Sequence, residues 1–254
     1  MHPETQKILG ISFFQGSLDS VCRLAREGGL VVAPSGPGMA SDLLGTGGYA
    51  EALQSAEIPL LDSGLICLWS KLFRSKSLVR VSGLAFLQEY LQSTDWNQEK
   101  ALWVMPNQKE SDSMLAWLDS RYGPHFDKNS VYIAPHYPES GRIEDKQLLQ
   151  KIEQVDPSNI FIQIGGGVQE RLGLFLQSRV KKGTTILCTG AALAFLSGEQ
   201  VKIPMWADHF FVGWAFRCMA NPRIFIPRYF KATKLIYLLA RYGSRLPKAY
   251  NSGN

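Results

Sequence analysis

The sequence predicts an α/β protein, in which a Rossmann-like, mostly parallel sheet is flanked by helices and followed by a C-terminal helical appendage. Short apolar runs alternate along the chain with stretches that have helical spacing. The runs are almost continuously apolar, as strands are when helices cover both faces of a parallel sheet. After residue 208 the strand-like runs stop, which indicates an appendage without strands.

Each element follows from this pattern. The predicted strands are Leu30–Ala33, Leu78–Val81, Ala101–Met105, Val131–Ala134, Ile160–Ile164 and Thr185–Cys188. The predicted helices between them are Leu84–Leu91, Ser111–Arg121, Ile143–Val155 and Gln169–Val180. We therefore divide the chain into an α/β domain, residues 1–208, and an appendage, residues 209–254. Ligands of such sheets bind beyond the carboxyl ends of the strands, so the loops there are where a site is expected.

Composition narrows the class of protein. With 254 residues, 45% of them apolar and 19% charged, the chain is predicted to be globular. The cysteines stand apart and the histidines lack metal-ligand spacing, so we predict no metal and no resident cofactor. The N-terminus is polar and no apolar stretch has the length of a membrane span, so we expect neither a signal peptide nor a transmembrane helix.

The positive charge of the chain is concentrated in the appendage. His209–Asn254 contains eight Lys or Arg residues, interleaved with aromatic side chains, and no Asp or Glu, although the whole chain carries only +5. A basic segment without acidic partners needs a counter-charge from a phosphorylated ligand, a nucleic acid or an anionic membrane. A solvated helix is the plainer alternative. Leu235, Ile236, Leu238 and Leu239 lie among the last bases, which favours an interfacial helix on lipid or, alternatively, ordinary packing on the α/β domain.

Three loops that follow apolar runs are candidates for a site. Gly165-Gly166-Gly167 precedes a helix, where backbone N–H groups suit a pyrophosphate, although three glycines also make an ordinary tight turn. Gly36-Pro37-Gly38 is an incomplete dinucleotide fingerprint. Asp62 follows Ile58–Leu61, where a carboxylate could act as a general base or as the N-cap of the next helix.

Taken together, these segments resemble the WecG/TagA/CpsF family, glycosyltransferase family 26, from about Leu30 to Tyr229. The similar pieces are Leu61-Asp62-Ser63-Gly64, Gly165-Gly166-Gly167-Val168-Gln169-Glu170, Lys202-Ile203-Pro204, Trp214 with Arg217, Pro222-Arg223, and Arg228-Tyr229. The family's Thr-x-Asn after the early strand is Ala33-Pro34-Ser35 here, and its Leu-Glu-Trp is Val212-Gly213-Trp214. These departures bear on the choice of sugar more than on the reaction class.

The resemblance implies an inverting, metal-independent transferase. Its members move a sugar, often N-acetylmannosamine, from a UDP-sugar to a polyprenyl-diphosphate-linked sugar at the inner face of the cell membrane, during teichoic acid, common antigen or capsule synthesis. It implies that Asp62 is the catalytic base and that Arg217, Arg223 and Arg228 bind the diphosphate. The donor sugar would lie near Ser35, the glycines Gly165, Gly166 and Gly167, and Gln169 and Glu170.

Two other functions remain open from the residues alone. One is a Rossmann-type, nucleotide-dependent oxidoreductase, which the incomplete fingerprint disfavours. The other is a non-catalytic protein that binds membrane or nucleic acid through the basic tail, whose aromatics could stack on bases. We expect the transferase, with no nucleic-acid partner.

Overall fold

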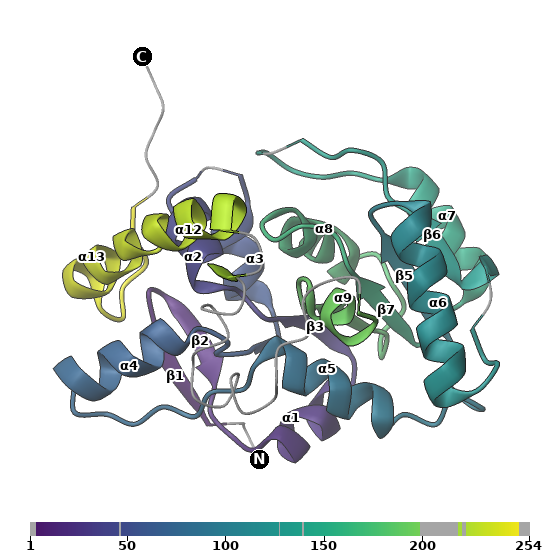
Figure 1. Cartoon of the computed structure of the whole chain (residues 1–254), viewed down its shortest axis with the longest axis horizontal. Helices are drawn as coiled ribbons and strands as arrows, with labels where there is room; N and C mark the ends of the chain where they lie inside the picture. Colours follow the sequence, from purple (N-terminus) through teal and green to yellow (C-terminus); the bar gives the residue numbers. More distant parts are fainter. Residues whose placement is uncertain are drawn as a thin grey trace.

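The computed structural model describes residues 4–45, 47–126, 128–138, 140–198, 218–219 and 222–248. Between 222 and 231 it describes the side chains of residues 222, 223, 226, 227 and 230. At its centre is a sheet of six parallel strands in the order β4-β3-β8-β7-β5-β6 (Figure 1). These strands are β3 (Gly29–Val32), β4 (Ile58–Pro59), β5 (Ala101–Met105), β6 (Val131–Ile133), β7 (Asn159–Ile162) and β8 (Thr185–Cys188). The predicted α/β fold class is confirmed.

Helices cover both faces of the sheet (Figure 1). The described helices are α1 (Leu18–Ala25), α2 (Gly36–Asp42), α3 (Tyr49–Ser55), α4 (Gly64–Phe73), α5 (Gly83–Gln92), α6 (Gln108–Tyr122), α7 (Lys146–Val155), α8 (Val168–Gln177), α9 (Ala192–Leu196), α12 (Pro222–Lys231) and α13 (Thr233–Tyr242), with a 3-10 turn η1 at Lys128–Ser130. Side chains of successive strand residues point to opposite faces. Accordingly Val32 belongs to a core that contains residues of α2, α3 and α8, whereas Val31 belongs to a second core with residues of α1, α5 and α9. Both faces are apolar, which is why the strands read as continuous apolar runs.

One predicted strand is wrong. Leu78–Val81 is an extended segment between α4 and α5, and the strand beside β3 is instead Ile58–Pro59. The backbone N–H of Val79 donates to Oε1 of Gln15 at 2.9 Å, and Val79 is exposed. Arg80 accounts for the difference, because its guanidinium forms an ion pair with Asp62, at 3.4 Å, instead of lying inside a buried strand.

An antiparallel hairpin near the N-terminus was not predicted. It consists of β1 (Thr5–Ile8) and β2 (Ile11–Phe14), joined by Leu9 and Gly10. Gly10 has a φ of +80°, and an added Cβ would lie 2.6 Å from Cβ of Leu246, so both the turn and the approach of the C-terminal segment require glycine. The turn of the hairpin therefore packs against the C-terminal segment at Leu246, so the two ends of the described chain are in contact.

The described end of the appendage is helical and packs on the α/β domain. Helix α12 lies on α2, and α13 lies against α2 and α4. Leu235, Leu238 and Leu239 are almost fully buried, in the same core as Leu30 and Ile162. The expectation that these leucines face lipid is therefore wrong, and their apolar face is part of the protein core. Among the described helices, none has both the length and the hydropathy needed to cross a bilayer.

Candidate active site at the carboxyl edge of the sheet

The three loops singled out in the sequence all follow parallel strands, and α2 connects them. A Cβ added at Gly36, the first residue of α2, would lie 2.9 Å from Oγ of Ser63, in the Asp62 loop. A Cβ added at Gly167 would lie 2.8 Å from Oδ2 of Asp42, the last residue of α2. Because the loops follow β3, β4 and β7 of one parallel sheet, they meet at its carboxyl edge.

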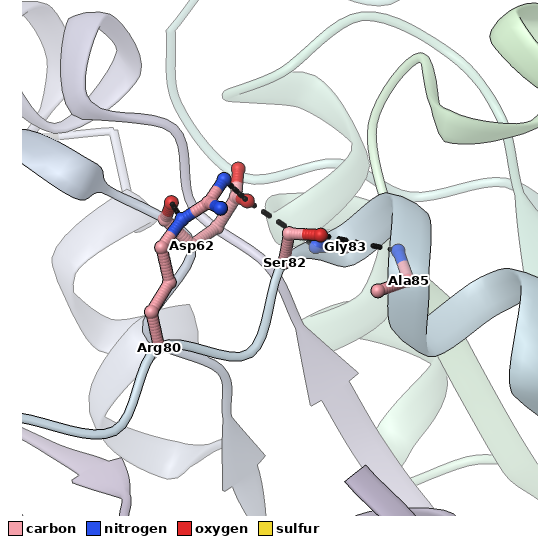
Figure 2. A network of polar contacts seen from close by, with 5 residues as sticks. All are labelled: Asp62, Arg80, Ser82, Gly83 and Ala85. Atoms are coloured by element: carbon pink, nitrogen blue, oxygen red, sulfur yellow. Dashed lines mark hydrogen bonds and ion pairs between the residues drawn. The ribbon is translucent and has the colours of Figure 1, made fainter. Parts of the chain in front are cut away.

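Asp62 lies between β4 and α4, and its carboxylate is held by groups from a later segment. Figure 2 shows the Arg80 side chain lying over Asp62. Nη2 of Arg80 is 3.4 Å from Oδ1 of Asp62, and Nε of Arg80 donates to the Asp62 carbonyl at 2.7 Å. The backbone N–H of Gly83, at the start of α5, also donates to Oδ1, at 3.3 Å. Both contacts to the carboxylate stabilise its negative charge.

These contacts decide against the helix-cap interpretation of Asp62. The N-cap residue of α4 is Ser63, and the Asp62 carboxylate points to the N-terminus of α5 rather than of its own helix. The Asp62 side chain is 28% exposed, so a bound molecule can reach it.

Sequence reasoning missed Arg80 and Gly83. Gly83 is the first residue of α5, whose N-cap Ser82 accepts the N–H of Ala85 at 3.1 Å (Figure 2). An added Cβ at Gly83 would lie 3.0 Å from Cβ of Ala33, so glycine allows α5 to approach the end of β3. A signal for Arg80 was present, because a lone arginine within a predicted buried strand demands an anionic partner.

The thiol of Cys67 lies in the same neighbourhood. Burial raises the pKa of Cys67 to about 11, against a smaller lowering by Arg80 and a smaller raising by Asp62. The reactive form of cysteine is the thiolate. Cys67 is therefore a protonated, unreactive thiol at neutral pH.

The glycine turn after β7 divides into an open part and a closed part. Gly165 and Gly166 are exposed, and no described atom lies within 4 Å of a Cβ built on either residue. The N–H of Gly167, by contrast, donates to Oε2 of Glu170 at 2.6 Å. The expectation of outward-pointing N–H groups is therefore wrong for Gly167, whereas Gly165 and Gly166 have space beside them among the described residues.

Gln169 and Glu170 are buried and hold the loops in place. Oε1 of Gln169 accepts the N–H of Gly190, after β8, at 3.0 Å, and its Nε2 donates to Oε1 of Glu170 at 3.0 Å. Glu170, in the first turn of α8, accepts the N–H of the N-cap residue Gly167, which is one half of a capping box. Gln169 thus connects the loops after β7 and β8, and its amide groups are engaged within the protein.

We predict that Glu170 makes stability depend on pH. Burial raises the pKa of Glu170 from 4.5 to about 6, against smaller lowering by its hydrogen bonds. The folded state therefore favours the protonated form, and this contribution is complete below pH 4.5 and lost as the pH rises through 6. Chemical denaturation from pH 4 to 7 should show the wild type losing about 2 kcal/mol of unfolding free energy relative to Glu170→Gln. If the difference in unfolding free energy between the wild type and Glu170→Gln stays constant from pH 4 to 7, the raised pKa of Glu170 is contradicted. The matched control is Glu153→Gln, because Glu153 is exposed.

Ser35 has a local role. Its Oγ accepts the N–H of Gly38 at 3.2 Å, which makes Ser35 the N-cap of α2. Gly36 and Gly38 lie in the first turn of that helix, with Pro37 between them. The incomplete dinucleotide fingerprint is therefore the capped first turn of α2, directly after β3.

The predicted diphosphate ligands are described only in part. Arg217 lies outside the described residues, as does the side chain of Arg228. Arg223 is exposed on α12, which packs on α2 and so lies near the loop after β3.

Gln163 and Thr189, after β7 and β8, are buried polar residues that sequence reasoning missed. Nε2 of Gln163 donates to Oγ1 of Thr189 at 3.1 Å, while Oε1 of Gln163 has no partner among the described residues.

Other features of the described chain bear on the site. No group of three His, Cys, Asp or Glu side chains in the described residues could hold a metal ion. A cavity of about 560 Å³ is lined by residues of α3, α8 and the segment 142–144, without Asp62 or Gly165–Gly167 among its lining. The predicted site residues Asp62 and Gly165–Gly167 therefore lie outside this cavity.

Comparison with known proteins identifies the family. The sequence model described as the "Glycosyl transferase WecG/TagA/CpsF family" matches residues 6–249, nearly the whole chain. A comparison with curated proteins found no match. Since the family model spans both the Asp62 loop and the glycine turn, the chain belongs to the WecG/TagA/CpsF family of glycosyltransferases.

Proposed function

We propose that the protein is an inverting, metal-independent hexosyltransferase that moves a sugar from a UDP-sugar to a polyprenyl-diphosphate-linked sugar. Membership of the family makes it a glycosyltransferase of cell-surface polysaccharide synthesis. The observation that carries the finer proposal is the Asp62 carboxylate, which is partly exposed and fixed by Arg80 and Gly83 at the carboxyl edge of the sheet.

In the proposed reaction Asp62 acts as general base. Its carboxylate accepts the proton of the acceptor hydroxyl while the hydroxyl oxygen forms a bond to the anomeric carbon. The bond from that carbon to the diphosphate breaks on the opposite face, and UDP leaves with the electron pair. A single displacement of this kind inverts the anomeric configuration. Arg80 is a positioning residue, because it holds both the carboxylate and the backbone of Asp62.

The donor would bind across the loops after β3, β7 and β8. Gly165 and Gly166 offer the close backbone approach that a diphosphate needs. Arg217, Arg223 and Arg228 would offset its charge, with residues 1–208 forming the catalytic unit and residues 209–254 the basic appendage. Gln169 and Glu170 would act indirectly, by fixing the glycine turn on which the donor rests.

The substrates follow from the same proposal. The donor sugar is N-acetylmannosamine-like, and the acceptor is carried by an anionic membrane during teichoic acid or capsule synthesis. The protein would work as a peripheral protein on the inner face of the cell membrane. Mixing the purified protein with UDP-N-acetylmannosamine and a short-chain prenyl-diphosphate-linked sugar should release UDP and give an inverted product by NMR. Absence of transfer with every UDP-sugar tried, under conditions where UDP binds, would contradict the proposal.

We predict that chelation leaves activity unchanged. Among the described residues no carboxylate cluster is available for a divalent ion, and the sequence contains no Asp-x-Asp. Cationic side chains would then stabilise the leaving diphosphate. Initial rates of UDP release should be equal with and without EDTA. A loss of rate that Mg²⁺ or Mn²⁺ restores would show that a metal supplies part of the charge.

A further inference from the structure

The C-terminal half of α4 exposes large apolar side chains. Leu68 is 52% exposed, Leu72 is 65% exposed and Phe73 is 64% exposed. The opposite side of the helix is used for packing, because Ile66, Cys67 and Ser70 are buried. Adjacent exposed apolar side chains on one helix mark a surface that contacts another protein or a membrane.

Charge distinguishes this surface from an ordinary apolar patch. Lys71, Arg74 and Lys76 lie beside the apolar residues and are exposed. The sequence contains no Asp or Glu from residue 63 to residue 88. The α4 segment is therefore a second basic and apolar stretch without acidic partners, separate in sequence from the C-terminal tail.

The fold brings these two stretches together. Helices α4 and α13 are in contact and lie at the same end of the molecule (Figure 1). A Cβ added at Gly243, which follows α13, would lie 3.2 Å from Nη2 of Arg74. Lys234, Tyr237 and Arg241 of α13 are exposed, while its leucines are used for packing. Two acid-free segments far apart in the sequence thus form one end of the protein.

We propose that this end of the protein, with Leu68, Leu72 and Phe73 of α4 at its centre, docks on an anionic lipid bilayer. The inference rests on the proposed function, in which the acceptor is membrane-linked. The apolar contact with lipid is assigned to α4, in place of the α13 leucines expected from the sequence. Apolar side chains enter the interface while neighbouring bases attract anionic headgroups. A two-fold dimer through this surface would place the same basic patches against each other, so charge favours lipid over a second copy.

The docking surface is also suitably placed for the reaction. Helix α4 begins two residues after Asp62 and contains ten residues, which corresponds to a length of about 15 Å. The exposed end of the helix therefore stands about one helix length from the catalytic carboxylate. A diphosphate-linked sugar that protrudes from the bilayer surface could span such a distance.

Vesicle co-sedimentation of the full-length protein tests the surface. The probe is vesicles of equal parts phosphatidylcholine and phosphatidylglycerol, compared with pure phosphatidylcholine. We expect the wild type to pellet with the anionic vesicles, and Leu68→Ser/Leu72→Ser to bind roughly tenfold or more weakly. Lys71→Gln should weaken binding about fivefold, and raised salt should act in the same direction. The matched control is Ile133→Ser, an exposed apolar residue of β6 at the other end of the sheet, which should bind like the wild type.

A second measurement separates this surface from the proposed function. Transfer to a water-soluble acceptor analogue should be equal for the wild type and all three variants, because none of these residues is placed in the catalytic machinery. If the wild type and the double serine variant pellet equally with the anionic vesicles, the proposed docking surface is wrong, whatever the transfer rate. Conversion of a wild-type dimer to a monomer by the same double substitution, measured by light scattering, would also overturn it, by assigning the patch to a second copy.

Discussion

Replacement of Asp62 by asparagine should lower transfer by roughly 10²–10⁴-fold, the usual contribution of a general base. The amide cannot accept the proton of the acceptor hydroxyl, yet it has the same shape. Its oxygen can still accept the N–H of Gly83, which the carboxylate accepts at 3.3 Å, so the loop should remain folded. Steady-state UDP release measures the loss, and UDP affinity should change little.

A control at another aspartate isolates the site. Asp19 lies on α1, where its side chain is 72% exposed and pairs with Arg23, so Asp19→Asn makes the same chemical change away from the carboxyl edge. This variant should transfer at the wild-type rate. Wild-type turnover in the Asp62 variant would remove this carboxylate from the mechanism, and an equal loss in both variants would indicate a general effect of charge.

Replacement of Leu235 by alanine should lower the free energy of unfolding by about 2–5 kcal/mol. Leu235 is fully buried on α13, in the core that also contains residues of α2 and the sheet, and its removal leaves a cavity there. The neighbouring residue Ile236 is 38% exposed, and Ile236→Ala should change stability far less, since it removes little packing. Urea denaturation of the two variants checks the difference. Equal effects would show that α13 is not part of the core in solution.

The same packing changes what truncation of the tail can show. Removing the chain after Phe230 would delete Leu235, Leu238 and Leu239 together, each at most 2% exposed. The truncated protein should lose stability as well as bases, so its behaviour on liposomes could not be assigned to charge. Point substitutions on the exposed side chains of α4 and α13 are the appropriate test of membrane contact.

Local pattern predicted most of the α/β sheet. Ala101–Met105 and Thr185–Cys188 are strands at the predicted bounds, because residues covered on both faces must be apolar. The pattern did not locate the edge strand Ile58–Pro59, which is only two residues long and contains a proline. It misassigned Leu78–Val81 because an apolar composition alone does not report the ion pair that Arg80 makes with Asp62.

For the candidate site, the sequence predicted positions but not contacts. Asp62 and the glycine turn follow β4 and β7 and so lie at the carboxyl edge of the sheet, as expected. Arg80 and Gly83 lie 18 and 21 positions after Asp62 in the sequence, and the tertiary fold brings them to it. Likewise, the sequence of the turn could not show that the N–H of Gly167 is hydrogen-bonded to the Glu170 carboxylate. Long-range contacts of this kind depend on the tertiary fold, which a local pattern does not contain.

A calorimetric titration with UDP is the most direct test of a sugar-nucleotide site at this edge of the sheet. The matched variant is Gly166→Asp, because no described atom lies within 4 Å of a Cβ at Gly166 and the added carboxylate would repel the diphosphate. We expect the wild type to bind UDP, and to bind neither NAD⁺ nor single-stranded DNA, and the variant to lose UDP binding while it stays folded. Equal UDP binding by both proteins, or binding of NAD⁺ or DNA in place of UDP, would contradict the account.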